Sequence, residues 1–280
     1  MNMREVWRKR AGFRIGVVFL AVMGIWSFSG EMQKSDQKRA GSITVTAHRG
    51  AAWTAPENTM AAVKNAVNQL SDYVEIDVQE TRDGVLVLLH DANLKRTTGL
   101  DREIWTVDYE EIENLDAGGW FQEAYEGETI PRLDQVLEYC RGKLLVNVEI
   151  KDNGHNEGIV KSVIQTIKDY DMLEQCVLSS MNYEFLCQAK ELEPELVTGY
   201  ILAEAGQDME LLQAADFVSV KYTCVTEEFV QKAHACGKEV HVWTVNSPGQ
   251  IRRMILLQVD NLITDLPQMA AEVLEEESRL

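Results

Sequence analysis

The stretch YVEIDVQETRDGVLVLLHD, residues 73–91, decides how the strands of this chain must be counted. Two apolar runs flank Asp83-Gly84, a dipeptide typical of a two-residue hairpin turn. On the first run Glu75 and Asp77 lie two residues apart, so on a strand they point to the same face. A two-residue turn would set Asp77 opposite His90. The stretch therefore predicts either a half-buried hairpin with a polar face or a site built from two carboxylates and an imidazole.

An alternation of strands and helices follows this stretch. Short apolar runs are separated by segments with helical periodicity, and serial βα units imply parallel strands. The run 85–90 lies too close to 73–79 for a parallel crossover, so we interpret it as a hairpin excursion after the second strand. The strands that each precede a helix or a helical insert are predicted to begin at residues 43, 73, 144, 176, 197, 217, 239 and 261.

Eight βα units in about 240 residues predict a TIM (β/α)8 barrel. The alternative is a doubly wound open sheet. No GxGxxG or Walker A sequence follows any predicted strand, so the usual nucleotide-binding form of that alternative has no support. Residues 92–130 have poor periodicity, and long connections in compact domains often form lids. We therefore expect a small insertion over the barrel mouth.

The composition limits the kinds of partner. A net charge of −18 disfavours nucleic acid and anionic membrane surfaces. The cysteines show no CxxC spacing, so neither a zinc knuckle nor a redox pair is indicated. The chain has five of them, Cys140, Cys176, Cys187, Cys224 and Cys236.

The first thirty residues differ from the rest of the chain. Basic residues within 4–14 precede an uncharged, mostly apolar run over 15–30, a pattern typical of a signal peptide or a short membrane anchor. A buried N-terminal helix is the alternative. The polar residues 31–42 are predicted to be a linker, and 43–280 the barrel domain. The positive-inside rule then predicts an extracytoplasmic protein, secreted or anchored to the membrane by an uncleaved N-terminal segment.

The barrel hypothesis selects candidate site residues, because the catalytic residues of this fold lie at the C-terminal ends of the strands. Three carboxylates, two histidines and several cations fall at or beside those ends. The residues concerned are His48, Arg49, Glu75, Asp77, His90, Glu149, Lys151, Lys221, Trp243, Asn246 and Asp265.

The carboxylates of this set indicate a cation site. Glu75, Asp77 and Glu149 offer hard oxygen ligands, which suit Ca²⁺ or Mg²⁺. Three clustered anions without a cation would repel one another, and each would raise the pKa of its neighbours.

The remaining side chains suit a phosphate ester. Arg49 and Lys151 could face an anionic substrate, since the guanidinium fork matches phosphate. His48 and His90 on either side of a phosphorus centre could serve as base and acid, because imidazole titrates near neutral pH. Trp243 could form an apolar wall of the pocket.

With these motifs in place, the chain resembles the glycerophosphodiester phosphodiesterase family of the phosphatidylinositol-phospholipase-C-like TIM barrels over about residues 43–268. The resemblance rests on the order and spacing of HRG (48–50), PENT (56–59), EIDVQxTxDG (75–84), HD (90–91), RTT (96–98), VEIK (148–151), WTVN (243–246) and TDxP (264–267).

The resemblance implies a divalent metal, Ca²⁺ or Mg²⁺, bound by Glu75, Asp77 and Glu149. It also implies that His48 and His90 are the catalytic pair. The expected reaction is hydrolysis of a glycerophosphodiester to glycerol 3-phosphate and an alcohol.

Further roles follow from the same resemblance. Arg49 and Lys151 would bind the substrate phosphate, and Trp243 would line the substrate pocket. Asn58 and Asp91 would support the residues that touch metal and substrate. The insertion at 92–130 would shape access for the alcohol.

Two departures from the family pattern concern substrate choice. The sequence Pro131-Arg132-Leu133 stands where the family often has PTL, and Ser180-Met181-Asn182 stands where it often has SF. Two alternatives keep the chemistry and change the substrate, namely a lysophospholipase D acting on lysophospholipid and a hydrolase of glycerol-phosphate wall polymers such as teichoic acid. A non-catalytic phosphodiester-binding surface protein is a more remote alternative.

Overall fold

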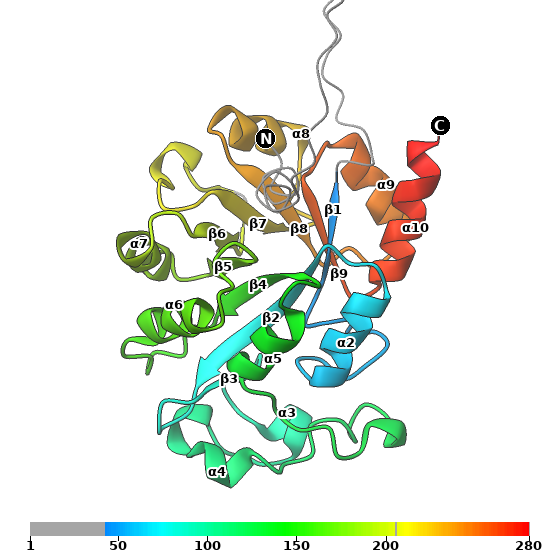
Figure 1. The fold of residues 1–280 in the computed structure, drawn as a ribbon. Coiled ribbons are helices and arrows are strands. Elements are labelled where there is room, and N and C mark those ends of the chain that lie inside the picture. Colours follow the sequence, from blue (N-terminus) through cyan, green and yellow to red (C-terminus); the bar gives the residue numbers. More distant parts are fainter. Residues whose placement is uncertain (1–42, 205, 280) are drawn as a thin grey trace, which may run out of the picture.

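The computed structural model describes residues 43–204 and 206–279, so the predicted signal or anchor (1–30) and the linker (31–42) lie outside the described residues. The described part is a TIM barrel with its helices on the outside, which confirms the predicted fold (Figure 1). The strands are β1 (Thr44–Ala47), β2 (Tyr73–Glu80), β3 (Leu86–Leu88), β4 (Leu145–Ile150), β5 (Cys176–Ser180), β6 (Val197–Leu202), β7 (Phe217–Lys221), β8 (Glu239–Trp243) and β9 (Asn261–Thr264).

Helices or helical turns follow most of these strands, and four short ones form the insertion. The helices outside the barrel are α2 (Met60–Asn68), α5 (Leu133–Cys140), α6 (Ile159–Asp169), α7 (Tyr183–Leu192), α8 (Glu227–Ala235), α9 (Pro248–Leu256) and α10 (Pro267–Ser278), with the 3₁₀ turn η5 (Met209–Leu211). The insertion holds α3 (Lys95–Thr98), η3 (Ile104–Thr106), α4 (Tyr109–Ile112) and η4 (Glu123–Tyr125).

The barrel closes through eight parallel strands. The order is β1-β9-β8-β7-β6-β5-β4-β2, and β1 pairs in turn with β2. The ninth strand, β3, is antiparallel to β2 and stands outside the parallel set, as the hairpin interpretation predicts.

The register of this hairpin differs by one residue from the sequence-based prediction. Val78 pairs with Leu88, so Asp77 faces Leu89 and not His90. The turn runs from Thr81 to Val85, closed by a backbone hydrogen bond of 3.0 Å from Thr81 N to Val85 O. Three residues therefore form the loop, where a two-residue turn was expected. Because β3 ends at Leu88, His90 lies beyond the ladder and turns into the mouth.

The position of β3 explains why His90 reaches the site. The pairing between β1 and β2 covers only Tyr73 and Val74 of β2, while β4 pairs with β2 as far as Val78. Toward the C-terminal end of β2, the edge that faces β1 is therefore not paired with β1. Strand β3 pairs with that edge from Val78 onward. The returning chain fills the gap between strands one and two, beside the loop that follows β1.

The alternation along each strand separates the helix-facing core from the barrel interior. On β4 the aliphatic Val146, Val148 and Ile150 belong to the main core beneath the helices. The intervening Leu145, Asn147 and Glu149 face the axis, in order from the floor to the mouth.

The floor of the barrel is apolar. Phe217 packs with Tyr73, Leu145 and Val177, and its ring fits because residue 199 is a glycine. A Cβ at Gly199 would lie 2.0 Å from two carbons of that ring. The floor is thus filled by side chains, and the chemistry is confined to the mouth.

The insertion has a small core of its own. Leu94, Ile104, Val107 and Ile112 are buried in a cluster separate from the main core. Its helices span four residues or fewer, which is why the sequence shows no helical periodicity there. In Figure 1 this segment extends beyond β3, and it contacts the loop after β1 through a 2.6 Å hydrogen bond from Tyr125 Oη to Thr54 O.

Within 43–204 and 206–279, no helix has both the length and the apolar character that a membrane crossing requires.

Candidate active site

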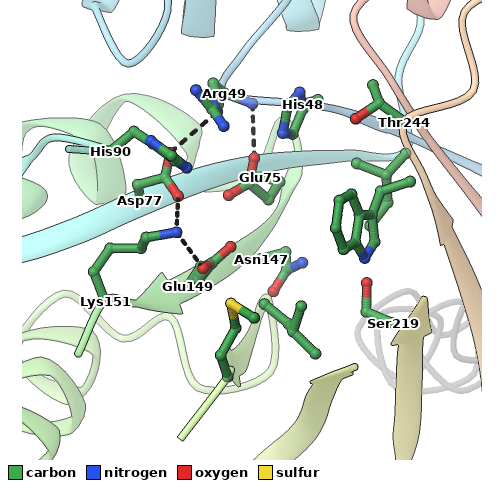
Figure 2. Close-up of a pocket in the computed structure, with 14 residues that line it drawn as sticks. His48, Arg49, Glu75, Asp77, His90, Asn147, Glu149, Lys151, Ser219 and Thr244 are labelled. Atoms are coloured by element: carbon green, nitrogen blue, oxygen red, sulfur yellow. Dashed lines mark hydrogen bonds and ion pairs between the residues drawn. The ribbon is translucent and has the colours of Figure 1, made fainter. Parts of the chain in front are cut away.

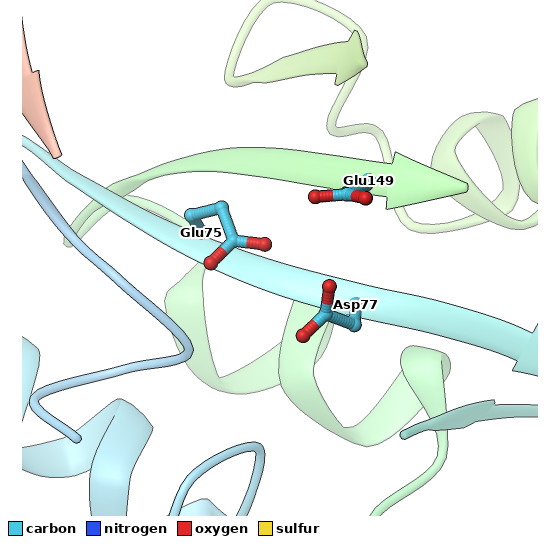
Figure 3. A group of neighbouring side chains, drawn as sticks. All are labelled: Glu75, Asp77 and Glu149. Atoms are coloured by element: carbon cyan, nitrogen blue, oxygen red, sulfur yellow. The ribbon is translucent and has the colours of Figure 1, made fainter. Parts of the chain in front are cut away.

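Three carboxylates meet at the mouth of the barrel. Glu75 and Asp77 project from the same face of β2, and β4 places Glu149 directly beside Asp77 in the ladder. One oxygen of each of these carboxylates lies within 4.8 Å of the others. Figure 3 shows the three side chains grouped on the neighbouring strands. Glu75 is only 4 % exposed and Asp77 only 1 %. The predicted acidic triad is therefore brought together in space, in a buried setting.

The crowding of these acids changes how they titrate. Burial and the charge of Asp77 raise the pKa of Glu75 to about 8. Burial and Asp77 also raise the pKa of Glu149. Burial would raise the pKa of Asp77 as well, but the charges of Lys151 and Arg49 outweigh it and hold that pKa at about 2. Without a further cation the cluster therefore retains protons at neutral pH.

Two cations border the triad. Lys151 follows β4, and its Nζ lies 2.6 Å from Glu149 Oε1 and 3.3 Å from Asp77 Oδ1. Nε of Arg49 lies 3.4 Å from Asp77 Oδ2, and its Nη1 donates to Glu57 at 2.9 Å. Both predicted phosphate-binding cations thus lie on the wall of the same cavity.

The turn after β1 has an unusual backbone that shapes this wall. Arg49 and Gly50 have φ values of 50° and 82°, a region in which glycine is at ease. Gly50 also lacks room for a side chain, since a Cβ there would lie 2.5 Å from Cβ of Ala62. The turn lets the backbone N–H of Arg49 donate to Glu75 Oε2 at 2.7 Å.

Each of the two histidines is held by a carboxylate. Nδ1 of His48 lies 2.7 Å from Asp265 Oδ1, and Nδ1 of His90 lies 2.7 Å from Asp91 Oδ1. This pairing leaves Nε2 of each ring for the cavity that both rings line (Figure 2). Asp265 is itself held by Asn246, whose Nδ2 donates to its Oδ2 at 2.5 Å.

The pKa values of the two imidazoles move in opposite directions. Burial lowers the pKa of His48, but the hydrogen bond to Asp265 and the charge of Glu75 outweigh it, so the pKa is raised. Burial lowers the pKa of His90, and the opposing charge of Asp77 does not restore it. One ring is thereby biased toward the protonated form and the other toward the neutral form, as an acid–base pair requires.

The structure also places the predicted supporting residues. Asn58 donates from Nδ2 to Asp77 Oδ2 at 2.7 Å and accepts from the Asp77 backbone N–H at 3.1 Å. Asn58 thus fixes the carboxylate of Asp77, just as Asp91 fixes the ring of His90. Sequence reasoning assigned no role to Asp265, Asn246 or Glu57. Only their positions in the sequence could have indicated a role. Asn246 and Asp265 follow the last two barrel strands, and Glu57 lies within PENT (56–59).

The cavity between these groups has a volume of about 150 Å³ and two chemically different ends. In Figure 2 the charged side chains lie on one side, and Ser219 and Thr244 lie on the other. Trp243, Ile201 and Ile263 complete the uncharged end. Nε1 of Trp243 is buried there with no hydrogen-bond partner among the described residues. A polar group of a bound molecule would satisfy it.

An eight-stranded barrel with an acidic triad, two carboxylate-held histidines and two cations at its mouth has the layout of a TIM-barrel enzyme that acts on an anionic substrate. The chain belongs to the glycerophosphoryl diester phosphodiesterase family, whose model matches residues 48–269. It is therefore an enzyme of the phosphoric diester hydrolase class, as the resemblance predicted.

Named relatives and solved structures agree with this assignment. The chain is 38 % identical, over 80 % of its length and 94 % of the relative, to a glycerophosphodiester phosphodiesterase of Caldanaerobacter subterraneus. It is 32 % identical to one of Bacillus altitudinis, covering 83 % and 98 % of the two chains. Among solved structures, an Oleispira antarctica phosphodiesterase in complex with the product sn-glycerol-3-phosphate superposes with a TM-score of 0.78 at 30 % identity, covering 85 % and 100 %.

Proposed function

We propose that this enzyme hydrolyses glycerophosphodiesters to glycerol 3-phosphate and an alcohol, with a divalent cation at the acidic triad and proton exchange by His48 and His90. The observation that carries the proposal is the convergence of the triad, both histidines and both cations on one small cavity. The product named for the Oleispira antarctica structure supports the same choice of substrate.

The residues of the triad fit a hard divalent cation. Oε1 of Glu75 is buried without a hydrogen-bond partner in the described structure, so a coordination position on it is open. A set of three carboxylates with no sulfur or nitrogen donor suits Ca²⁺ or Mg²⁺. Glu75, Asp77 and Glu149 would hold the ion, which when bound would offset negative charge on the phosphoryl oxygens.

The protein's own groups would perform the remaining steps. Arg49 and Lys151 would bind the non-bridging phosphate oxygens and stabilise the charge that builds up on them. One imidazole would take the proton of the nucleophile through Nε2, and the other would give a proton to the leaving alcohol oxygen. The nucleophile is water in direct hydrolysis. If the glycerol 2-hydroxyl attacks instead, a cyclic phosphate forms and water opens it in a second step. Asp265 and Asp91 would hold the two rings with Nε2 toward the phosphorus.

The uncharged end of the cavity favours the glycerol half of the substrate. Ser219 is buried at 2 % exposure, and Nε1 of Trp243 has no partner in the described structure, so both could hydrogen-bond to hydroxyl groups. The space is small, which favours unesterified glycerol over the acylated glycerol of a lysophospholipid. We therefore rank a glycerophosphodiesterase ahead of a lysophospholipase D or a teichoic acid hydrolase acting through the same site.

An assay on four substrates tests this proposal. We expect turnover of glycerophosphocholine and glycerophosphoethanolamine, and much slower turnover of lysophosphatidylcholine and of a glycerol-phosphate polymer. EDTA should abolish activity, and added Ca²⁺ or Mg²⁺ should restore it, because the triad would otherwise be uncompensated. Full activity in EDTA would contradict the metal assignment. Faster turnover of lysophosphatidylcholine would instead identify a lysophospholipase D, and faster turnover of the polymer would identify a teichoic acid hydrolase.

A pH profile of Asp265→Asn tests how His48 is tuned. The carboxylate of Asp265 helps to raise the pKa of His48, and a neutral amide would remove that help. We therefore expect the limb of the kcat/KM profile that reports His48 to move to lower pH. Movement of the alkaline limb would identify His48 as the acid, and movement of the acidic limb as the base. A profile in which neither limb moves would contradict a proton-transfer role for His48.

We also propose that the enzyme works outside the cytoplasm. The basic residues within 4–14, followed by an uncharged run over 15–30, support export or anchoring. Fractionation of cells that produce the full chain, with N-terminal sequencing of the product, separates secretion from anchoring.

A further inference from the structure

Arg96, in helix α3 of the insertion, is bound by two carboxylates at once. Its Nε donates to Asp91 Oδ2 at 2.6 Å. Its Nη1 and Nη2 donate to the two oxygens of Glu57, both at 2.8 Å. All three guanidinium nitrogens are thereby used, in a fork geometry that a lysine could not reproduce.

Both carboxylates make a second contact with the site itself. Oδ1 of Asp91 accepts a hydrogen bond from Nδ1 of His90 at 2.7 Å. Glu57 accepts from Nη1 of Arg49 at 2.9 Å. Arg96 is thus the middle member of a continuous path that runs from His90 to Arg49 and touches neither end directly.

The two carboxylates of this path, Asp91 and Glu57, remain ionised at the pH values at which the enzyme would work. The hydrogen bond from Arg96 is the main reason that the pKa of Asp91 lies at about 2. Burial would raise the pKa of Glu57, but hydrogen bonding and charge from Arg96, together with the charge of Arg49, outweigh it and lower that pKa. Both carboxylates can therefore keep their ion pairs with Arg96, and Glu57 can also keep its ion pair with Arg49, across the neutral pH range.

Asp91 needs such a partner in order to hold His90. It follows His90 directly in the chain and its side chain is 36 % exposed, so on its own it would be free to turn toward water. An exposed pair of this kind contributes little by itself. Fixing Oδ2 on Arg96 leaves Oδ1 directed at the ring and favours the tautomer with the proton on Nδ1.

The insertion has contacts of its own besides those of Arg96. Leu94, Ile104, Val107 and Ile112 form its core and are fully buried. A second arginine, Arg82 in the turn after β2, also fastens the insertion, with Nε donating to Asp108 Oδ1 at 2.8 Å. Arg96 is therefore one of several contacts that hold this segment, and it is the one whose partners also touch His90 and Arg49.

We propose that Arg96 is a positioning residue, which acts through Asp91 and Glu57 to set the orientation of His90 and Arg49 together. Docking of the insertion on the mouth is thereby coupled to assembly of the catalytic set. This inference rests on the proposed function in one respect, since it assumes that His90 exchanges a proton during hydrolysis.

The test compares Arg96→Gln and Arg96→Lys with Arg82→Gln as the matched control. We expect both Arg96 variants to lower kcat on glycerophosphocholine by about 10- to 100-fold and also to raise KM, because His90 and the phosphate-binding Arg49 both lose their support. Lysine keeps the charge but cannot bind Asp91 and Glu57 simultaneously, and it serves if the glutamine variant fails to fold. Arg82→Gln should keep kcat within about twofold, because its ion pair does not reach either histidine.

A spectroscopic measurement shows whether Arg96 orients the His90 ring or only holds the insertion against the barrel. In the wild-type enzyme the ¹⁵N shifts of the His90 ring should report a proton on Nδ1, and Arg96→Gln should shift them toward a tautomer mixture. Unchanged shifts, or a kcat equal to that of Arg82→Gln, would overturn the proposal. An additive effect of Arg96→Gln and Asp91→Asn would also overturn it, because residues on one path should not add. Absence of turnover by the wild type would overturn the proposed function alone, since the ring shifts still test Arg96.

Discussion

His48→Ala and His90→Ala should each lower kcat on glycerophosphocholine by about 10²–10⁴-fold, the usual contribution of a positioned acid or base. KM should change much less. Arg49 and Lys151 remain in place in both variants, and these two cations would supply most of the attraction for the phosphate. The loss should therefore appear in the chemical step rather than in binding.

A substrate with a better leaving group distinguishes the two histidines. The 4-nitrophenyl ester of glycerol phosphate releases a phenolate that needs no protonation, so removal of the general acid should cost little with this substrate. The variant that lacks the base should remain slow with both substrates. The opposite shifts in the pKa values of His48 and His90 lead us to expect this asymmetry. Equal rescue of both variants, or rescue of neither, would contradict the division into acid and base.

His155→Ala is the control for this pair. The His155 ring stacks on Trp105 with ring centroids 4.2 Å apart, and His155 does not line the catalytic cavity. We expect its kcat to match that of the wild type. A loss as large as that of the other two variants would show that removal of any nearby imidazole disturbs the site.

The barrel could be predicted from the sequence because each strand carries its own signal. Strands β5, β6 and β7 begin at the predicted residues 176, 197 and 217. These strands are short, rich in β-branched residues and separated by segments with helical periodicity. The acidic triad followed from the same reasoning, since Glu75, Asp77 and Glu149 lie at neighbouring strand ends.

The hairpin register could not be read from the turn dipeptide alone. Asp83-Gly84 favours a two-residue turn, but Oγ1 of Thr81 bonds to Asp83 and to the Val85 backbone and stabilises a three-residue loop. Gly84 adopts a φ of 85° within that loop. The length of the loop thus depends on hydrogen bonds of one side chain. A change of one residue in the register moves every side chain of the strand to the opposite face of the sheet.

Asp91 adjoins His90 in the sequence and could be predicted as its support, but the other residues that orient the catalytic groups could not. Asp265 contacts His48 across 217 positions of the sequence, and only closure of the barrel brings the last strand beside the first. Arg96 and Glu57 are similarly joined across 39 positions by the folding of an insertion that lacks periodicity. Ordinary polar residues acquire these roles from tertiary contact, for which a single sequence carries no local signal.

Glu75→Gln should abolish metal-dependent activity, lowering kcat/KM by at least about 100-fold, and at the same time stabilise the metal-free protein. Removal of one of three ligands would weaken cation binding. It would also relieve the repulsion within the triad, because burial and Asp77 raise the pKa of Glu75 from its ordinary value of 4.5 to about 8.

The direction of the stability change follows from that shift. Between pH 4.5 and 8 the folded protein keeps a proton on Glu75 that the unfolded chain has released. The free energy of unfolding contributed by this group therefore falls as the pH rises through that window. Above the window the loss should be on the order of 5 kcal/mol in the absence of metal, since each pKa unit corresponds to about 1.4 kcal/mol. Glutamine does not titrate, so thermal unfolding of the variant in EDTA should lose this pH dependence and occur at higher temperature near pH 8.

Added metal should raise the stability of the wild type far more than that of the variant. Ca²⁺ or Mg²⁺ at about 100 times its dissociation constant would stabilise the wild type by about 2.7 kcal/mol and the variant by far less. Glu80→Gln is the matched control, on the same strand and outside the triad, and it should respond to metal as the wild type does. An equal response of the Glu75 variant to metal would contradict the assignment of Glu75 as a ligand. A wild type whose stability in EDTA does not fall between pH 5 and 8 would show that the triad is not strained without a cation. The site would then be a charge cluster balanced by Arg49 and Lys151 alone.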